Sequence, residues 1–278
     1  MPEYTPPHTK AHGFYFGIPL RAKACSQNWA LVCRNLEMTL SSLAGQSHHD
    51  FKVLVACHEQ PDIDTFDLDI EFIIADSPVP PLLDDKGEPG NDKPLKKRLL
   101  GMALKAQVTQ PFYYMQLDAD DLIHPELVAK TLSDDNRCGY LIDKGFMLDC
   151  DSGRFGICDP EHSPFWQQCG SCAVVCFTPE DLPVKLMDNQ CYFTQFKRHR
   201  EYAEIAAKHG RPLTPFNDYM GVYMVNHGEN DVSAYRGKID VKSNYVRRHL
   251  LENEAMVQRL RALYPPLDAL IARPASKV

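Results

Sequence analysis

The sequence of 278 residues lacks any uninterrupted apolar run near the roughly 20 residues that a membrane-spanning helix needs. It also lacks an excess of basic residues, since 30 Lys and Arg against 37 Asp and Glu give a formal net charge of −7. This balance argues against a general nucleic-acid-binding protein, which needs positive charge to neutralise phosphates. Residues 1–13 lack the basic-then-apolar pattern of a secretory signal. We therefore expect a cytoplasmic protein with no nucleic-acid partner and no transmembrane segment.

The ten cysteines lack the spacing of a clear metal site. Cys169 and Cys172 form one CxxC pair, but a second CxxC and a nearby pair of histidines are missing. Disulfides are not expected because thiols of cytosolic proteins stay reduced. The segment from Cys172 to Cys176 is apolar and predicts a buried strand in which cysteine serves as a small hydrophobic residue. A structural zinc ion therefore remains only the minor alternative.

Apolar runs and helical spacings predict an α/β fold. Continuous apolar segments predict buried strands, and apolar residues three to four positions apart predict helices between them. The expected elements of the first half are strands at 14–20, 52–57, 70–75 and 112–117, with helices at 26–45 and 95–106. The second half adds helices at 125–132, 196–209 and 246–264 and strands at 139–148, 154–158 and 170–177. Strands without alternation predict a mostly parallel, Rossmann-like sheet with helices on both faces.

A basic run lies just ahead of the fourth strand. Lys96, Lys97 and Arg98 follow a long polar loop at 76–94 and, by helical spacing, lie on the more exposed sides of the helix at 95–106. Long loops of this kind often work at a site. The run could neutralise the phosphates of a nucleotide, together with Lys93, or it could be a solvated helix face. The residues alone leave both interpretations open.

Three carboxylates follow the strand at 112–117 within four positions: Asp118, Asp120 and Asp121. Clustered carboxylates repel one another, so this arrangement costs stability unless positive charge lies nearby. A divalent cation bound together with a phosphorylated substrate would supply that charge. In open α/β sheets, the carboxyl ends of the strands are where ligands bind. The alternative is a solvated turn, or a cap of the helix that Pro125 opens.

A second polar segment occurs about a hundred residues later. Asp218 precedes His227 by nine positions, and His227 is surrounded by Gly, Asn and Asp rather than by apolar residues. Such a histidine is suited to metal binding, although an ordinary loop histidine is the alternative. Asp218 could act as a general base. It could equally cap a helix that begins at Tyr219.

Six short motifs follow one another along the chain from Phe14 to about Ser233. They are FYFGIP at 14–19, TLSSLAGQ at 39–46, KVLV at 52–55, LDADD at 117–121, HPEL at 124–127 and HGENDVS at 227–233. In this order and spacing, they resemble the motifs of the GT-A glycosyltransferases that use nucleotide sugars, in the family-2-like form with an Asp-x-Asp motif. Each motif is weak alone, and together they are fairly specific. The family pattern often has paired Asp where this sequence has Ala-Cys-His-Glu at 56–59, so the nucleotide base is undetermined.

The resemblance implies a GT-A fold, a metal-dependent and inverting transfer from a nucleotide-diphosphate sugar, with a UDP-sugar favoured, and Mn²⁺ or Mg²⁺ as cofactor. The acceptor would be a glycan or a lipid-linked molecule. The implied metal ligands are Asp120 and His227, and the implied catalytic base is Asp218. The implied contacts with the donor nucleotide are Pro19, Arg21, Lys97, Arg98, Asp118 and Ala119. Asp121 is expected to be structural or to support its neighbours.

The same resemblance divides the chain into a flexible N-terminus at 1–13, one domain at 14–238 and a C-terminal helical extension at 239–278. Within the domain, 14–121 would bind the nucleotide sugar, and 122–238 would bind the acceptor and complete the metal site. The helical extension could mediate oligomerisation. Its arginines could contact an anionic membrane, or they could pair with Glu252 and Glu254 on the same helix.

Two other functions fit parts of the sequence. A nucleotidyltransferase that makes a nucleotide sugar also combines a parallel sheet with carboxylates and metal ions. That class usually has a Gly-rich, basic loop after the first strand, and residues 18–23 (IPLRAK) have the charge without the glycines. A non-catalytic module that binds a carbohydrate or a partner could keep the same fold. The two enzymes would bind a metal and a nucleotide at Asp118–Asp121, whereas this module would not.

Overall fold

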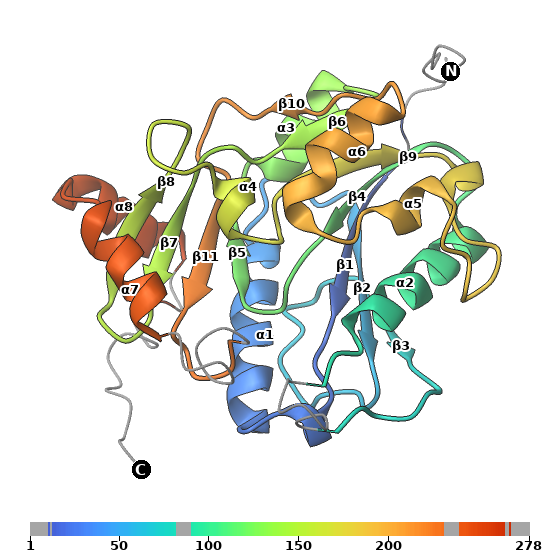
Figure 1. The fold of residues 1–278 in the computed structure, drawn as a ribbon, viewed down its shortest axis with the longest axis horizontal. Helices are drawn as coiled ribbons and strands as arrows, with labels where there is room; N and C mark the ends of the chain where they lie inside the picture. The colour runs from blue at the N-terminus through green and yellow to red at the C-terminus, as the bar shows by residue number, and fades with distance from the viewer. Residues whose placement is uncertain (1–10, 12, 82–89, 231–238, 265–266, 268–278) are drawn as a thin grey trace.

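The structure, a computed structural model that describes residues 11, 13–81, 90–230, 239–264 and 267, is built around one large sheet (Figure 1). Its strands are β1 (Phe14–Pro19), β2 (Phe51–Cys57), β3 (Ile70–Ile74), β4 (Phe112–Gln116), β6 (Gly139–Leu141), β9 (Ala173–Phe177) and β10 (Thr214–Pro215). They lie in the order β10-β6-β9-β4-β1-β2-β3. Neighbours are parallel except where β9 pairs with β4 and with β6. The predicted α/β class and mostly parallel sheet are confirmed.

A second, smaller sheet lies beside the first. It consists of β5 (Asp121–Ile123), β7 (Gly145–Asp149), β8 (Arg154–Cys158) and β11 (Gly221–Val225). The order is β5-β11-β7-β8, and β11 is parallel to β7 while the other pairs are antiparallel. Because β5 starts at Asp121, the acidic loop at 118–120 joins the large sheet to the small one.

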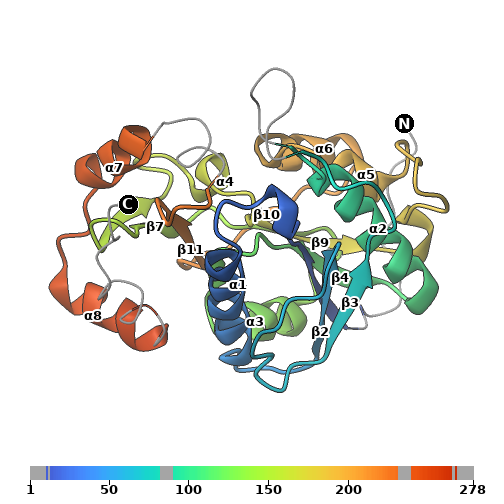
Figure 2. The same cartoon turned by 90° about the horizontal axis from the view of Figure 1, so that it is seen from below.

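Helices cover both faces of the large sheet. The α-helices are α1 (Trp29–Ala44), α2 (Lys93–Gln107), α3 (Leu127–Asp134), α4 (Phe165–Gln168), α5 (Tyr192–Gln195), α6 (Tyr202–Lys208), α7 (Ile239–Arg248) and α8 (Glu254–Leu263). Short 3-10 turns occur at η1 (Lys23–Cys25), η2 (Pro179–Asp181) and η3 (His199–Glu201). Figure 2 shows α1 and α3 on one side of the large sheet, α2, α5 and α6 on the other, and α7 and α8 beside the small sheet. No helix in the described ranges is long and apolar enough to cross a membrane.

The predicted spacing of α1 is confirmed by its packing. Leu36, Leu40 and Leu43 are fully buried in the main core, where they pack with the continuous apolar strands β1 and β2. The helix begins later than predicted because the Asn28 Oδ1 atom accepts a hydrogen bond from the Leu31 amide at 3.1 Å. An asparagine in this position satisfies one of the free N–H groups at the helix start.

Several predicted elements of the second half are divided. The predicted strand at 139–148 is two strands, β6 in the large sheet and β7 in the small one. The predicted helix at 196–209 is η3 followed by α6. The predicted helix at 246–264 is interrupted, because Leu250 pairs with Gly156 of β8 and Asn253 caps α8 by accepting from the Met256 amide. The helix expected from Tyr219 is wrong, since the strand β11 follows instead.

Part of the predicted organisation lies outside the described residues. Of the predicted flexible segment at 1–13, only residues 11 and 13 are described, as are few of the residues after 264. Of the extension, α7 contacts β7 and β8, and Leu260 of α8 packs with Met38 of α1 and Leu122 of β5. The division into a domain and an extension stays a prediction.

Candidate functional site

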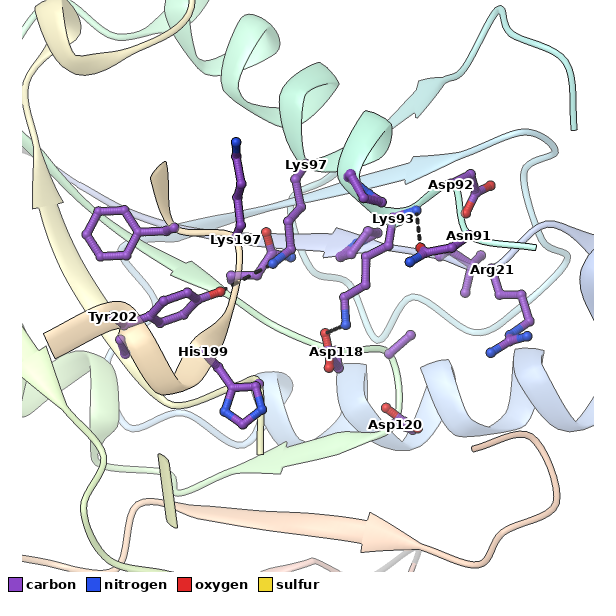
Figure 3. A pocket seen from close by; sticks show the side chains of 18 of the residues that line it. Arg21, Asn91, Asp92, Lys93, Lys97, Asp118, Asp120, Lys197, His199 and Tyr202 are labelled. Atoms are coloured by element: carbon purple, nitrogen blue, oxygen red, sulfur yellow. Dashed lines mark hydrogen bonds and ion pairs between the residues drawn. The ribbon is translucent and has the colours of Figure 1, made fainter. Parts of the chain in front are cut away.

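A cavity of ≈ 560 Å³ lies where β1 and β4 end, between the start of α2 and the segment from α5 to α6 (Figure 3). This volume falls within the roughly 300–1,000 Å³ that is typical of small-molecule sites. All of the predicted donor and metal residues line it: Pro19, Arg21, Lys97, Arg98, Asp118, Ala119, Asp120 and His227. The structure therefore brings together residues that lie up to 208 positions apart in the sequence, from Pro19 to His227.

The Asp118 carboxylate is held by lysines of α2. Its Oδ1 atom lies 2.7 Å from Nζ of Lys93, and Figure 3 shows this pair in the middle of the cavity. Burial raises the pKa of the Asp118 carboxyl, but the Lys93 and Lys97 ammonium groups outweigh it, so that the net pKa lies below the usual value. Asp118 is therefore ionised at neutral pH, and a ligand that contacts Lys93 must compete with this ion pair.

Asp121 holds the acidic loop in place through buried hydrogen bonds. It is 1 % exposed, and its Oδ2 atom accepts hydrogen bonds from Ser171 Oγ at 2.5 Å and Cys169 Sγ at 3.0 Å. Ser171 Oγ in turn accepts from the Asp118 amide at 2.9 Å. Burial, and then the carboxylates of Asp120 and Asp118, raise the pKa of Asp121 well above its usual value. Asp121 thus has a structural role, as expected from the sequence.

Cys169, the first cysteine of the CxxC pair, forms this hydrogen bond with Asp121. Because Cys169 donates its S–H to Asp121, and burial raises its pKa well above the usual value, it is a thiol rather than a thiolate ligand. All ten cysteines are free. Within the described ranges, no group of three or more His, Cys, Asp or Glu residues is arranged to hold a metal.

Asp120 and His227 meet at the edge of the cavity. The Asp120 Oδ2 atom lies 2.8 Å from Nε2 of His227 and 3.4 Å from Nδ2 of Asn230. On the other side of the ring, Asn35 Nδ2 lies 2.9 Å from His227 Nδ1, and the Glu229 amide lies 3.4 Å from it. Since two donors face Nδ1, the proton of the neutral ring lies on Nε2 and is donated to Asp120.

This pair fits a divalent cation if Asn35 turns. The Asn35 Oδ1 atom is buried without a hydrogen-bond partner, and a half-turn of the amide exchanges its oxygen and nitrogen. The oxygen would then accept a proton on His227 Nδ1, provided that the Glu229 amide gives up its longer contact of 3.4 Å with this atom. Nε2 would then be free to bind a metal next to Asp120. Two protein ligands suffice for Mg²⁺ or Mn²⁺ when phosphates and water complete the shell. The residues present therefore fit the implied ion.

Positive charge surrounds the carboxylates. Arg21, Lys93, Lys97, Arg98 and Lys197 all line the cavity. Burial, and then the neighbouring Lys93, lower the pKa of Lys97 to about 8, and its Nζ donates to the Tyr202 hydroxyl at 3.2 Å. A dianionic ligand would raise the pKa of Lys97 again and gain a charged partner. The chemistry of the cavity is therefore suited to an anion such as a diphosphate.

The prediction that Asp218 is the catalytic base is not supported by its position. Asp218 does not line the cavity; its side chain is 57 % exposed and forms an ion pair with Lys130 of α3. The hydrogen bond from Lys130 lowers the pKa of Asp218 below the usual value. A carboxylate that is held by a lysine outside the cavity cannot take a proton from a substrate within it.

The sequence did not single out several residues of the site. Asn35 looked like a polar position of a helix, and Lys197 and His199 belong to a basic segment that resembles a solvated surface. Glu229 and Asn230 lie in the quoted HGENDVS motif, but without an assigned role. That motif continues to 233, and its last three residues lie outside the described part of the chain.

No family model and no curated protein sequence matches the chain. Among solved structures, the chain is distantly similar to Staphylococcus aureus TarS, with 14% identity and a TM-score of 0.39. That likeness covers 92% of this chain and 43% of the other. GlyE, a glycosyltransferase from Streptococcus pneumoniae TIGR4, shows 10% identity and a TM-score of 0.35, with 97% and 67% coverage. A protein of Desulfovibrio desulfuricans G20, described as a nucleotide-diphospho-sugar transferase, shows 13% identity and a TM-score of 0.35, with 95% and 98% coverage. This chain thus spans about two fifths of the length of TarS, and all three likenesses are distant.

Proposed function

We propose that this protein is a metal-dependent glycosyltransferase that moves a sugar from a nucleotide-diphosphate sugar to a hydroxyl group of a glycan or lipid-linked acceptor. The observation that carries the proposal is the Asp120–His227 pair, which faces the same cavity as Asp118 and five cationic side chains. Carboxylate and imidazole ligands for a divalent ion, beside lysines and arginines for phosphates, are what a bound nucleoside diphosphate requires.

The residues would act on the two ends of the breaking bond. When bound, Mn²⁺ or Mg²⁺ would neutralise charge on the diphosphate leaving group. Arg21 and Lys97 would bind phosphate oxygens, and Asp118, which is fixed by Lys93 and by its amide bond to Ser171, would orient the donor's sugar or ribose. We favour a UDP-sugar and an inverting transfer, in which the acceptor oxygen attacks the sugar carbon from the side opposite the diphosphate.

We expect UDP to bind at least about tenfold more tightly with Mn²⁺ than without it, a difference in binding free energy of about 1.4 kcal/mol or more. Asp120→Ala should abolish this difference because it removes the carboxylate that faces His227. Isothermal titration calorimetry with UDP, with and without Mn²⁺, measures both quantities. Asp151→Ala is a matched control, since Asp151 is exposed in the turn between β7 and β8 and does not line the cavity.

The same assay contradicts the proposal if UDP, GDP and dTDP all bind without any dependence on the metal. If binding is found, hydrolysis of a panel of nucleotide sugars then identifies the donor. A nucleotidyltransferase would instead consume a nucleoside triphosphate and a sugar phosphate and release pyrophosphate. A binding module would bind without turning over either set of substrates.

A further inference from the structure

His199 presents one unprotonated nitrogen at the cavity. It belongs to η3 and lines the cavity, and Figure 3 shows its ring close to Asp118. Its Nδ1 atom lies 2.6 Å from the backbone carbonyl oxygen of Trp166, at α4. A carbonyl oxygen can only accept, so the proton of the neutral ring must lie on Nδ1. Nε2 therefore carries a lone pair, and it has no hydrogen-bond partner among the described residues.

The carboxylates that line the cavity are each engaged with a partner. Asp92 pairs with Lys96, Asp118 with Lys93 and Asp120 with His227, and Glu229 accepts from the Asn28 amide at 2.5 Å. The His227 Nε2 atom is directed at Asp120 and is required there for a metal. Lys97 is mostly protonated at neutral pH, since its lowered pKa of about 8 still lies above 7, and its Nζ donates to Tyr202. Within the described lining, this leaves His199 as the group that is both unprotonated and available to a substrate hydroxyl.

We propose that His199 is the general base of the transfer, acting through Nε2; this inference rests on the proposed function. As the acceptor oxygen forms its bond to the anomeric carbon, its proton moves to Nε2 of His199. The bond between that carbon and the diphosphate oxygen breaks, and its electron pair leaves with the nucleoside diphosphate. The resulting imidazolium returns its proton to water after product release, so that protons and charge balance over one cycle.

The surroundings of His199 suit this role. Burial lowers the pKa of its ring below the usual value, which keeps the ring neutral and able to accept a proton at neutral pH. The charged groups that act on it are Asp118, Lys93 and Arg200. Once the ring is protonated, the Trp166 carbonyl and the Asp118 carboxylate stabilise the new charge, while Lys93 and Arg200 oppose it and promote proton release.

His199→Asn separates catalysis from structure. The asparagine amide can donate to the Trp166 carbonyl as Nδ1–H does, but it offers no basic nitrogen. We expect hydrolysis of the donor sugar that the panel identifies to fall about 10²- to 10⁴-fold, because water must lose a proton to attack. Azide has no proton to lose, so its reaction with the same donor to give the glycosyl azide should stay within about threefold of the wild-type rate. Calorimetric binding of UDP with Mn²⁺ should be unchanged.

The pH profile gives a second readout. The wild-type hydrolysis rate should rise with pH as His199 loses its proton, in a range below the usual pKa of histidine, and His199→Asn should lack this rise. His209→Asn is the matched control, since His209 lies at the end of α6 and bonds to Gln195 outside the cavity. Its rates of donor hydrolysis and of glycosyl azide formation should equal those of the wild type.

Equal rates of hydrolysis in wild type and His199→Asn, or equal losses with water and azide, would overturn the assignment of the base. Absence of metal-dependent binding and of hydrolysis in the wild type would overturn the proposed function itself.

Discussion

Replacement of Lys96 by methionine should lower the free energy of unfolding by about 3–5 kcal/mol, the usual cost of removing one partner of a buried ion pair. The Lys96 side chain is 0% exposed, and its Nζ lies 2.5 Å from Asp92 Oδ2 and 2.5 Å from the carbonyl oxygen of Leu20. The side chain of Asp92 is 13% exposed and is also approached by His58 Nδ1 at 3.2 Å. Methionine fills the space of the lysine stem but leaves the Asp92 carboxylate and the Leu20 carbonyl without this partner.

Urea unfolding followed by circular dichroism measures this loss as a shift of the midpoint at constant slope. Lys105→Met is the matched control on the same helix, because Lys105 is half-buried and donates to a single carbonyl, that of Pro179; we expect a cost below about 1 kcal/mol. Adding Asp92→Asn to Lys96→Met should recover part of the loss, since a neutral amide needs no counter-charge. A Lys96→Met variant within 1 kcal/mol of wild type would show that the pair contributes little.

This lysine also shows what local sequence patterns cannot predict. The spacing of Leu95, Leu99 and Met102 correctly predicts α2, yet it places Lys96 on a more exposed side, which is wrong. Burial of the ammonium depends on the Leu20 carbonyl at the end of β1, 76 positions away. No periodicity within the helix contains that information. The mostly parallel sheet, by contrast, was predictable because β1, β2 and β4 are continuous apolar runs, as expected of strands that are covered on both faces.

Residues of the candidate site were predictable from the sequence where they belong to a short motif. Asp120 and His227 are 107 positions apart, and the motifs that contain them predict that they share one site. Asp218 shows the limit, because sequence does not reveal that Lys130 holds it outside the cavity. His199 lies in a run of basic residues, and the Trp166 carbonyl that orients its ring is 33 positions away.

Gly17→Ala should destabilise the protein by about 3 kcal/mol, at the upper end of the usual cost of overpacking a core. A Cβ atom at Gly17, in the buried strand β1, would lie 2.1 Å from the Tyr114 hydroxyl oxygen and 2.6 Å from two ring atoms. Tyr114 cannot easily move away because it is 4% exposed and packs on Phe193, with ring centroids 5.0 Å apart. Its hydroxyl also donates to Gln116 Oε1 at 3.2 Å, and Gln116 Nε2 donates to the Gly17 carbonyl at 2.8 Å.

The same unfolding assay tests whether the clash with Tyr114 is the cause. Gly45→Ala is the matched control, because Gly45 has an ordinary φ of −79° at the end of α1 and its added Cβ would meet nothing closer than 3.6 Å. That variant should be neutral or about 0.5 kcal/mol more stable, since alanine restricts the unfolded chain. In a Tyr114→Ala background the cost of Gly17→Ala should fall below about 1 kcal/mol, as coupled neighbours are not additive. If Gly17→Ala costs the same with and without the Tyr114 ring, the strain arises elsewhere in β1, and the ring is not held against this glycine.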